Sequence, residues 1–252
     1  PVTRADLHDF AVLLPHYVVF QMEQTWSSVA FAGRYKTRYG LVLSDALCIL
    51  AYSYLHAALL RELGYPCVHV VPMYSRPAGT ERLTSAVEAD RNTSLARLNM
   101  SDRSFDFTFY GGCSDRRARL LQEVRQLFPQ CAPHPPAPAA PNGLEVTPPC
   151  FKYSMHCVGW YTGVFDSTRL LQVLQSRLVL NLHTDENSVL EAHRLNYLLS
   201  LGRCVISERS DDVLLDARYA GAVHLVDVGD VAALHSVATR LLGNVSELHQ
   251  CE

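Results

Sequence analysis

The chain has 252 residues, of which 48% are apolar, and its formal net charge is -3. That length suits one large domain or two small ones with ample core. The near-neutral balance excludes a general electrostatic attraction to nucleic acid or anionic membranes, and no apolar run of the sequence is long enough to cross a bilayer.

The eight cysteines do not predict a zinc ribbon, because none lies in a C-x-x-C pair. Three that lie inside apolar runs are interpreted as small core residues, namely Cys48, Cys67 and Cys204. An even count permits disulfides, but a chain of this size does not need them, so we expect a reducing, cytoplasmic compartment. Three N-x-S/T acceptor triplets point the other way, although such triplets often arise by chance. They begin at Asn92, Asn99 and Asn244.

A strand–helix–strand unit is predicted in the first hundred residues. The β-branched and aromatic run at 17–24 predicts a buried strand, and 48–52 predicts a second one. Residues 54–66 have leucines at helical spacing and a stop at Gly64, which predicts an amphipathic helix. A strand at 67–74 completes the unit of a parallel α/β sheet.

The alternation of strands and helices resumes after a polar linker at 76–103. The predicted elements are a strand at 105–112, a helix at 114–128, a strand at 144–146, a helix at 167–175, a strand at 177–183, a helix at 189–202, strands at 204–208 and 222–230, and a helix at 231–243. Residues 132–143 are rich in Pro and Ala and predict a solvated surface loop. We therefore expect an α/β fold of two halves, divided near Ser101.

Glycines and arginines follow the strand at 105–112. Gly111 and Gly112 precede Ser114, a predicted N-cap, and a phosphate could approach the glycines closely at the amino end of the helix. Arg116 or Arg117 could add positive charge, which would suit a nucleotide diphosphate. A tight turn followed by a solvated basic helix is an equally good interpretation.

Polar residues also follow the strand at 177–183. Its apolar run implies burial on both faces, and ligands of parallel sheets bind beyond the carboxyl ends of the strands, where His183 lies. Glu191 and Arg194 open the next helix and would face the mouth of a cleft. Alternatively, Ser188 and Glu191 form a capping box, and Glu191 pairs with Arg194 on the surface.

The strand at 204–208 ends on Ser207 and Glu208, where a carboxylate could bind sugar hydroxyls. An N-cap and a first-turn acid are the alternative. In the first half, Glu23 and Gln24 end their strand at the matching position and could face the same cleft, or could be a polar strand terminus.

These motifs resemble, in order and spacing, those of bacterial and viral GT-B-type glycosyltransferases related to the spore-maturation CgeB-like proteins. The stretches that carry the resemblance are Q-M-E-Q, Y-S before a helix ending L-G-Y, FYGGCSDRRARLL, RLVLNLH and EAHRLNYLLSLGRCVISE. They extend from about Tyr17 to about Gly243.

The resemblance implies two Rossmann-like lobes, 1–100 on the acceptor side and 101–252 on the donor side, with a nucleotide-sugar between them. The donor-binding residues that it implies are Gly111, Gly112, Arg117, His183, Glu191, Arg194, Ser207 and Glu208. No metal or other cofactor is expected, because backbone amides and basic side chains offset the charge of the leaving diphosphate.

The chain departs from the family pattern in two places. Tyr197 stands where a second glutamate is expected, and the first lobe lacks its opening strand and glycine loop. The chain begins at Pro1 rather than at Met, so we expect it to be processed or cut from something longer and this lobe to be incomplete. No signal-peptide pattern opens the sequence. Glu23 is the candidate catalytic base.

The sequence thus predicts a glycosyltransferase that moves a sugar from a nucleotide-sugar, most simply a UDP-sugar, to a hydroxyl acceptor that it does not identify. The alternative is a non-catalytic relative that binds a nucleotide-sugar or serves as an interaction module in a larger protein. A third interpretation is another nucleotide-dependent enzyme such as a sugar epimerase, for which no dinucleotide fingerprint is present.

Overall fold

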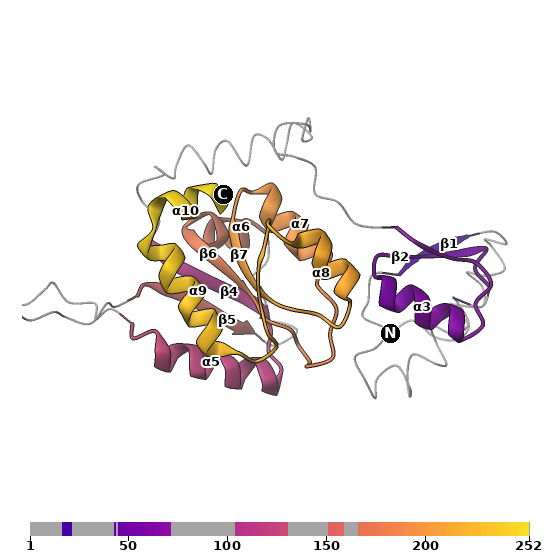
Figure 1. Cartoon of the computed structure of the whole chain (residues 1–252), viewed down its shortest axis with the longest axis horizontal. Helices are drawn as coiled ribbons and strands as arrows, with labels where there is room; N and C mark the ends of the chain where they lie inside the picture. Colours follow the sequence, from indigo (N-terminus) through magenta and orange to yellow (C-terminus); the bar gives the residue numbers. More distant parts are fainter. Residues whose placement is uncertain are drawn as a thin grey trace, which may run out of the picture. The chain divides into compact units, whose positions relative to one another are not determined.

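The described residues form an α/β structure with parallel sheets (Figure 1). The computed structural model of the chain describes residues 17–21, 43, 45–71, 104–130, 151–158 and 166–251. Every described strand pairs in parallel with its neighbours, as the predicted alternation of strands and helices requires. The predicted linker at 76–103, the loop at 132–143 and the strand at 144–146 lie outside the described residues.

The chain divides into two compact units. The first comprises Pro1–Ser75, Asp185–Asn196 and Arg209–Ala220, and the second comprises Arg76–Thr184, Tyr197–Glu208 and Gly221–Glu252. The predicted boundary near residue 101 placed all of the later chain in one half. The structure instead assigns two later segments to the first unit.

The first unit contains a parallel sheet in the order β1-β2-β3. β1 spans Val18–Gln21, β2 spans Cys48–Ala51 and β3 spans Val68–Val70, and α3 (Tyr54–Glu62) connects β2 with β3. The predicted strand–helix–strand unit is confirmed, and Gly64 follows the helix with a φ of 91°, which glycine adopts at little cost. The core residues of this unit are Leu43, Ile49, Ala51, Ala57, Leu60 and Val68.

The buried carboxylate of Asp212 connects two helices of the first unit. Its Oδ1 accepts a hydrogen bond of 3.0 Å from the Leu215 amide and caps α8 (Val213–Tyr219). Its Oδ2 accepts from the Ser53 hydroxyl at 2.7 Å and from the Leu55 amide at 3.0 Å, at the start of α3. One carboxylate therefore satisfies first-turn amides of both helices, which helps to explain why this later segment belongs to the first unit.

The second unit contains a parallel sheet in the order β5-β4-β6-β7-β8. In that order its strands span Tyr153–Val158, Phe105–Gly112, Ser176–Asn181, Cys204–Glu208 and His224–Val226. The sequence predicted all of them except β5. The chain passes from β4 outward to β5 and then returns to β6 on the other side of β4. The space between β4 and β6 is therefore a topological switch point.

Helices cover both faces of the five-stranded sheet (Figure 1). α5 (Asp115–Leu127) and α9 (Val231–Gly243) lie side by side on one face, with α10 (Val245–Cys251) beside α9, and α6 (Asp166–Leu174) packs on the other face. Right-handed crossovers require this arrangement, because the chain reverses its direction across the sheet after β5. The largest fully buried side chains of the core that includes α5 and α9 are Phe107, Phe109 and Phe128.

Three helices differ from the sequence prediction. α7 (Ala192–Ser200) begins at Ala192 rather than at Val189. α8 and α10 were not predicted, because helices of seven residues are too short to show a clear hydrophobic period. Within the described part of the chain, no helix is long and apolar enough to cross a membrane.

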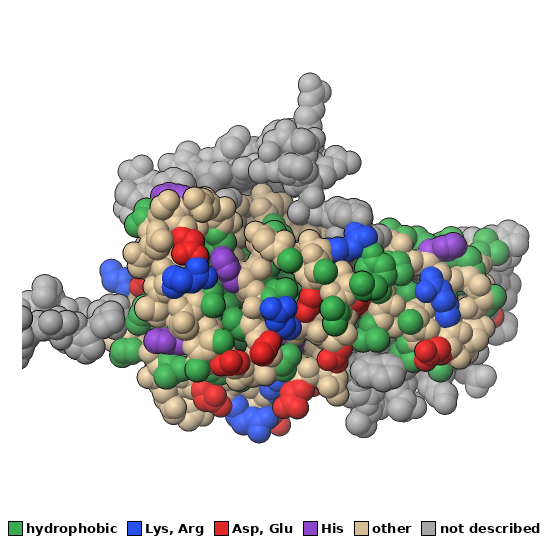
Figure 2. Space-filling view, in the orientation of Figure 1, with side chains coloured by type: hydrophobic (Ala, Val, Ile, Leu, Met, Phe, Trp, Pro, Cys, Tyr) green, Lys and Arg blue, Asp and Glu red, His purple; other side chains and the backbone are tan. Residues whose placement is uncertain are grey.

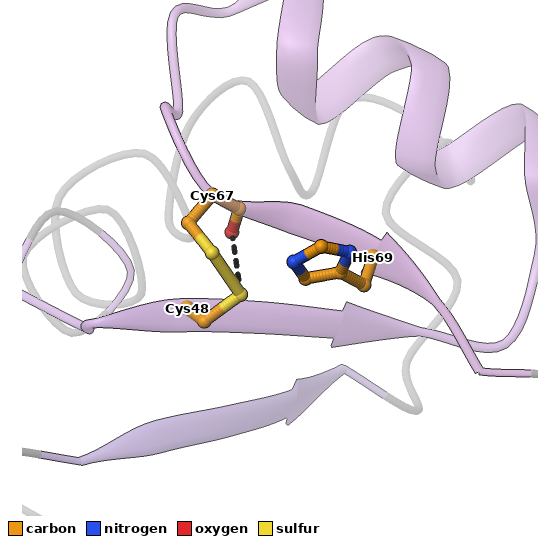
Figure 3. A group of neighbouring side chains, drawn as sticks. All are labelled: Cys48, Cys67 and His69. Carbon is orange, nitrogen blue, oxygen red and sulfur yellow. Dashed lines mark hydrogen bonds between the residues drawn. A yellow bond between two sulfur atoms is a disulfide. The ribbon is translucent and has the colours of Figure 1, made fainter.

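The three cysteines interpreted from the sequence as small core residues are paired in disulfides. Cys204 is fully buried in the core as expected, whereas Cys48 and Cys67 are partly buried. Cys48 on β2 is bonded to Cys67, just before β3 (Figure 3), and Cys204 on β7 is bonded to Cys251 at the end of α10. The pairs are 19 and 47 residues apart, and strand pairing and the return of α10 bring them together. Because disulfides persist in oxidising compartments, they argue against the expected cytoplasmic location.

Replacing Asp212 by Ala should destabilise the first unit by about 2–4 kcal/mol, because buried donors on α3 and α8 lose their acceptor. Hydrogen exchange should show the loss of protection concentrated in these two helices. Asp211 is exposed beside it and supplies the matched control. Equal effects of Asp211→Ala and Asp212→Ala would contradict this account.

The side chain of His56 on α3 is buried without hydrogen bonds. It is 1% exposed, and neither ring nitrogen has a partner among the described residues. Burial lowers the pKa of His56 from 6.5 to about 4, although the Asp212 carboxylate raises it in part. The folded chain therefore keeps this imidazole neutral at pH values where the unfolded chain protonates it.

The free energy of unfolding should consequently fall as the pH is lowered from 6.5 to about 4, by about 3 kcal/mol from this group. The sign follows from the unfolded state, which binds the additional proton throughout that window. Urea unfolding of the wild type and of His56→Leu at several pH values measures the difference. The same slope in both proteins would show that His56 does not cause it.

Candidate site at the carboxyl edge of the five-stranded sheet

Predicted site residues from three strands meet at one edge of the second unit. Gly111 and Gly112 end β4, His183 follows β6, and Glu208 ends β7. The carboxyl ends of parallel strands lie on the same edge, so the sheet topology alone brings these residues together. This edge includes the switch point between β4 and β6.

Ser114 joins the two loops that flank the switch point. Its hydroxyl donates to the Thr184 carbonyl at 2.8 Å, in the loop after β6. The same oxygen accepts from the Arg117 amide at 3.2 Å, which confirms Ser114 as the N-cap of α5. The amino end of α5 is thereby held against the loop that carries His183.

Arg116 and Arg117 point inward from the first turn of α5. They are 8% and 4% exposed, so a solvated basic start of this helix is wrong. The Nε of Arg117 donates to the Leu182 carbonyl at 2.9 Å and its Nη1 to the Gly112 carbonyl at 3.0 Å. Nη1 of Arg116 donates to the His183 carbonyl at 2.8 Å. Both arginines therefore tie α5 to the loop after β6.

Glu208 is the centre of the hydrogen-bond network at this edge. It is 2% exposed. Its Oε1 accepts from Nη2 of Arg116 at 2.5 Å and from the Gly229 amide at 2.8 Å. Its Oε2 accepts from Nη1 of Arg116 at 2.9 Å and from the His183 amide at 2.6 Å. One carboxylate thus connects the end of β7 with the segments that follow β4, β6 and β8.

The environment of Glu208 favours its ionised form. Burial raises the pKa of Glu208, but the hydrogen bonds from Arg116 and from the Gly229 and His183 amides outweigh burial, so the pKa lies below its usual 4.5. The stability that this lowered pKa contributes is present above pH 4.5 and is lost as the pH falls through the folded-state pKa. Glu208 is therefore an ionised organiser of the edge at neutral pH.

Ser207 also makes its hydrogen bonds within the protein. It pairs with Asn181 in the β6–β7 register, and its hydroxyl accepts from Nδ2 of Asn181 at 2.9 Å and donates to the Glu208 carbonyl at 2.9 Å. Both side chains are fully buried. Sequence reasoning placed Ser207 and Glu208 at the correct edge, but it did not foresee how their polar atoms are satisfied. An acid that ends a buried strand was the available signal, because such a charge requires a partner.

The other predicted side chains are not among the described residues of the second unit. Glu191 and Arg194 belong to the first unit and form an ion pair of 2.8 Å, as their i, i+3 spacing predicted. The predicted capping box is wrong, because α7 begins after Glu191, and Ser188 donates instead to the Asp185 carbonyl at 3.0 Å. Glu23, the candidate catalytic base, lies outside the described residues.

Backbone groups at the switch point remain available to bind a ligand. Gly112 is exposed, and a Cβ added there would meet nothing within 4 Å. The amides of Asp115 and Arg116, the first two of α5, have no hydrogen-bond partner among the described residues. Such amides at the positive end of a helix dipole bind anions. The arrangement therefore suits a phosphate that is held mainly by backbone groups.

Two groups of side chains resemble metal sites. In each, two cysteines and one histidine bring their ligand atoms within 4.8 Å of one another, and the groups are Cys48, Cys67 and His69 (Figure 3) and Cys204, His224 and Cys251. The two sulfurs of each group are bonded to each other, so neither is a thiolate ligand. The contact of 3.2 Å drawn from Cys48 to the Cys67 carbonyl is not a donated hydrogen bond, since a disulfide sulfur carries no proton.

The charges on the surface are mixed. Acidic and basic side chains lie among one another on the face that Figure 2 shows, without a broad patch of either sign over the five-stranded unit. This distribution agrees with the near-neutral net charge. On that face, nothing offers the basic stripe that a nucleic acid would require.

Replacing Glu208 by Gln should destabilise the second unit by about 3–5 kcal/mol, because the buried Arg116 guanidinium loses its counter-charge. Glu123 is exposed on α5, so Glu123→Gln is the matched control and should leave the unfolding midpoint nearly unchanged. Adding Arg116→Met to a Glu208→Leu variant should recover part of the loss. The changes in the free energy of unfolding are measured with denaturant. If the changes caused by the two substitutions are strictly additive, the two side chains are not a coupled pair.

No family model matches the chain, and no curated protein matches it. The α/β fold with a parallel five-stranded sheet therefore stands on the structure alone. The resemblance to GT-B-type glycosyltransferases rests on the sequence stretches quoted above and enters the functional argument as a hypothesis.

Proposed function

We propose that the chain is a GT-B-like glycosyltransferase, with two Rossmann-like lobes, that uses a nucleotide-sugar, most simply a UDP-sugar. The observation that carries the proposal is the exposed Gly112 at the carboxyl edge between β4 and β6. Ligands of doubly wound sheets bind at such a switch point. Here it combines an exposed glycine with the amino end of a helix of 13 residues.

In this proposal the diphosphate of the donor lies over Gly111 and Gly112 and accepts hydrogen bonds from the first amides of α5. These dipoles are fixed before the reaction, so they stabilise the charge that develops on the leaving diphosphate without reorganisation. Arg117 and Glu208 act as positioning residues, since they hold the surrounding loops in place. The sugar is transferred to a hydroxyl acceptor, and Glu23 remains the candidate base.

A specific observation favours a second candidate, a non-catalytic nucleotide-sugar-binding module. The charged side chains Arg116, Arg117 and Glu208 all make hydrogen bonds within the protein at this edge. Binding by backbone amides is compatible with that arrangement, whereas catalysis also needs groups that reach the acceptor. Incubation of the chain with a panel of UDP-sugars distinguishes the candidates. An enzyme releases UDP over time, and a binding module is stabilised by the donor without turnover.

UDP should raise the melting temperature, because a ligand at about 100 times its Kd adds about 2.7 kcal/mol to the free energy of unfolding. Gly112→Gln should abolish this rise, since the new side chain occupies the space that the diphosphate needs. The melting temperature without ligand should stay the same, because no atom of the described residues lies within 4 Å of the added Cβ.

Gly243 is the matched control, since a Cβ added there also meets nothing within 4 Å and it lies at the far end of α9. Gly243→Gln should keep the full response to UDP. A response that survives in Gly112→Gln, or that is absent from the wild type with UDP, GDP, ADP and CMP alike, would contradict a nucleotide site at the switch point.

A further inference from the structure

We propose that Asn244 is an N-glycosylation site and that the chain folds in an oxidising compartment where N-glycans are attached. Asn244, Val245 and Ser246 form an N-x-S triplet, in which Asn244 separates α9 from α10 and the other two residues begin α10. Of the three triplets in the sequence, this is the one that lies within the described residues. The inference does not depend on the proposed function.

The geometry of the triplet leaves the acceptor nitrogen accessible. Asn244, Val245 and Ser246 are all exposed, Val245 by 60%. The Oδ1 of Asn244 accepts from the Glu247 amide at 3.2 Å, and its Nδ2 has no partner among the described residues. A glycan on Nδ2 keeps the carbonyl oxygen as an acceptor. Modification is therefore compatible with the hydrogen bond that begins α10.

The disulfides supply the second, independent observation. Cys48–Cys67 lies in the first unit and Cys204–Cys251 in the second, and Cys113 is also disulfide-bonded. Paired cysteines in both units indicate that the chain meets an oxidising environment as it folds. In cells that attach N-glycans, the same compartment contains the oligosaccharide donor and its transferase.

The modification is a group transfer without change of oxidation state. Nδ2 of Asn244 forms a bond to the anomeric carbon of an oligosaccharide carried on a polyprenyl diphosphate. The bond between that carbon and the diphosphate oxygen breaks, and the lipid diphosphate leaves with the bonding electrons. The amide nitrogen gives up one proton to a base of the transferase.

The position of the turn keeps a glycan away from the switch point. Arg177, at the start of β6, donates through Nη2 to the Leu242 carbonyl at 3.1 Å. The end of α9 therefore lies at the amino edge of the sheet, opposite the carboxyl edge that carries Gly112 and Glu208. A glycan on Asn244 would project from that amino edge and leave the candidate site open.

The test is expression of the full chain behind a cleavable secretion signal in a eukaryotic cell, followed by mass spectrometry of the peptide that contains Asn244. Enzymatic deglycosylation in heavy-oxygen water marks each formerly occupied asparagine as labelled aspartate. The wild type and Ser246→Thr should carry the mark at Asn244. Ser246→Ala should lose it completely while retaining the capping asparagine.

Two results would overturn the proposal. One is an unmodified Asn244 peptide from secreted wild-type protein whose disulfides have formed. The other is free thiols at Cys48, Cys67, Cys204 and Cys251 in the protein isolated from its own cells, because it would then have folded outside such a compartment. Both results are measured in the absence of UDP, so they are independent of whether the proposed nucleotide site exists.

Discussion

The carboxylate of Glu208 is the interaction on which the arrangement of the candidate site depends. It accepts hydrogen bonds from the Arg116 guanidinium and from the amides of His183 and Gly229. A charge that is 2% exposed is tolerable only because each oxygen has two donors. The same four bonds hold the end of β7 against the segments that follow β4, β6 and β8, so the edge is organised before any ligand arrives.

Asp212 acts in the first unit by the same physical principle. It is 3% exposed, and its two oxygens receive the Leu215 amide on one side and the Ser53 hydroxyl and Leu55 amide on the other. In each unit, one buried carboxylate accepts hydrogen bonds from segments that are distant in sequence and so holds those segments together. Asp212 fixes the amino ends of α3 and α8, which are short helices with little intrinsic stability of their own.

The charged side chains at the carboxyl edge of the second unit make their hydrogen bonds within the protein, and this limits what the edge can bind. Arg116 and Arg117, in the first turn of α5, donate to backbone carbonyls and to Glu208. The positive potential available to an anion at this point therefore comes from helix amides and from the glycine backbone. Such a site favours a phosphate by shape and dipole. It is also compatible with the mixed surface charge in Figure 2, since no general attraction of anions is required.

The sequence by itself determined the α/β class, most of the strands and the longer helices. β4, β7 and α9 match their predicted ranges, because a buried strand or a helix of 13 residues has a clear hydrophobic period and clear end signals. It also placed Gly111, His183 and Glu208 at strand ends, which parallel pairing turns into one edge. Only the tertiary structure decided the partners. The bonds of Glu208 to Arg116, of Asp212 to Ser53 and of Cys204 to Cys251 join residues far apart in sequence, where no local period or cap records the contact.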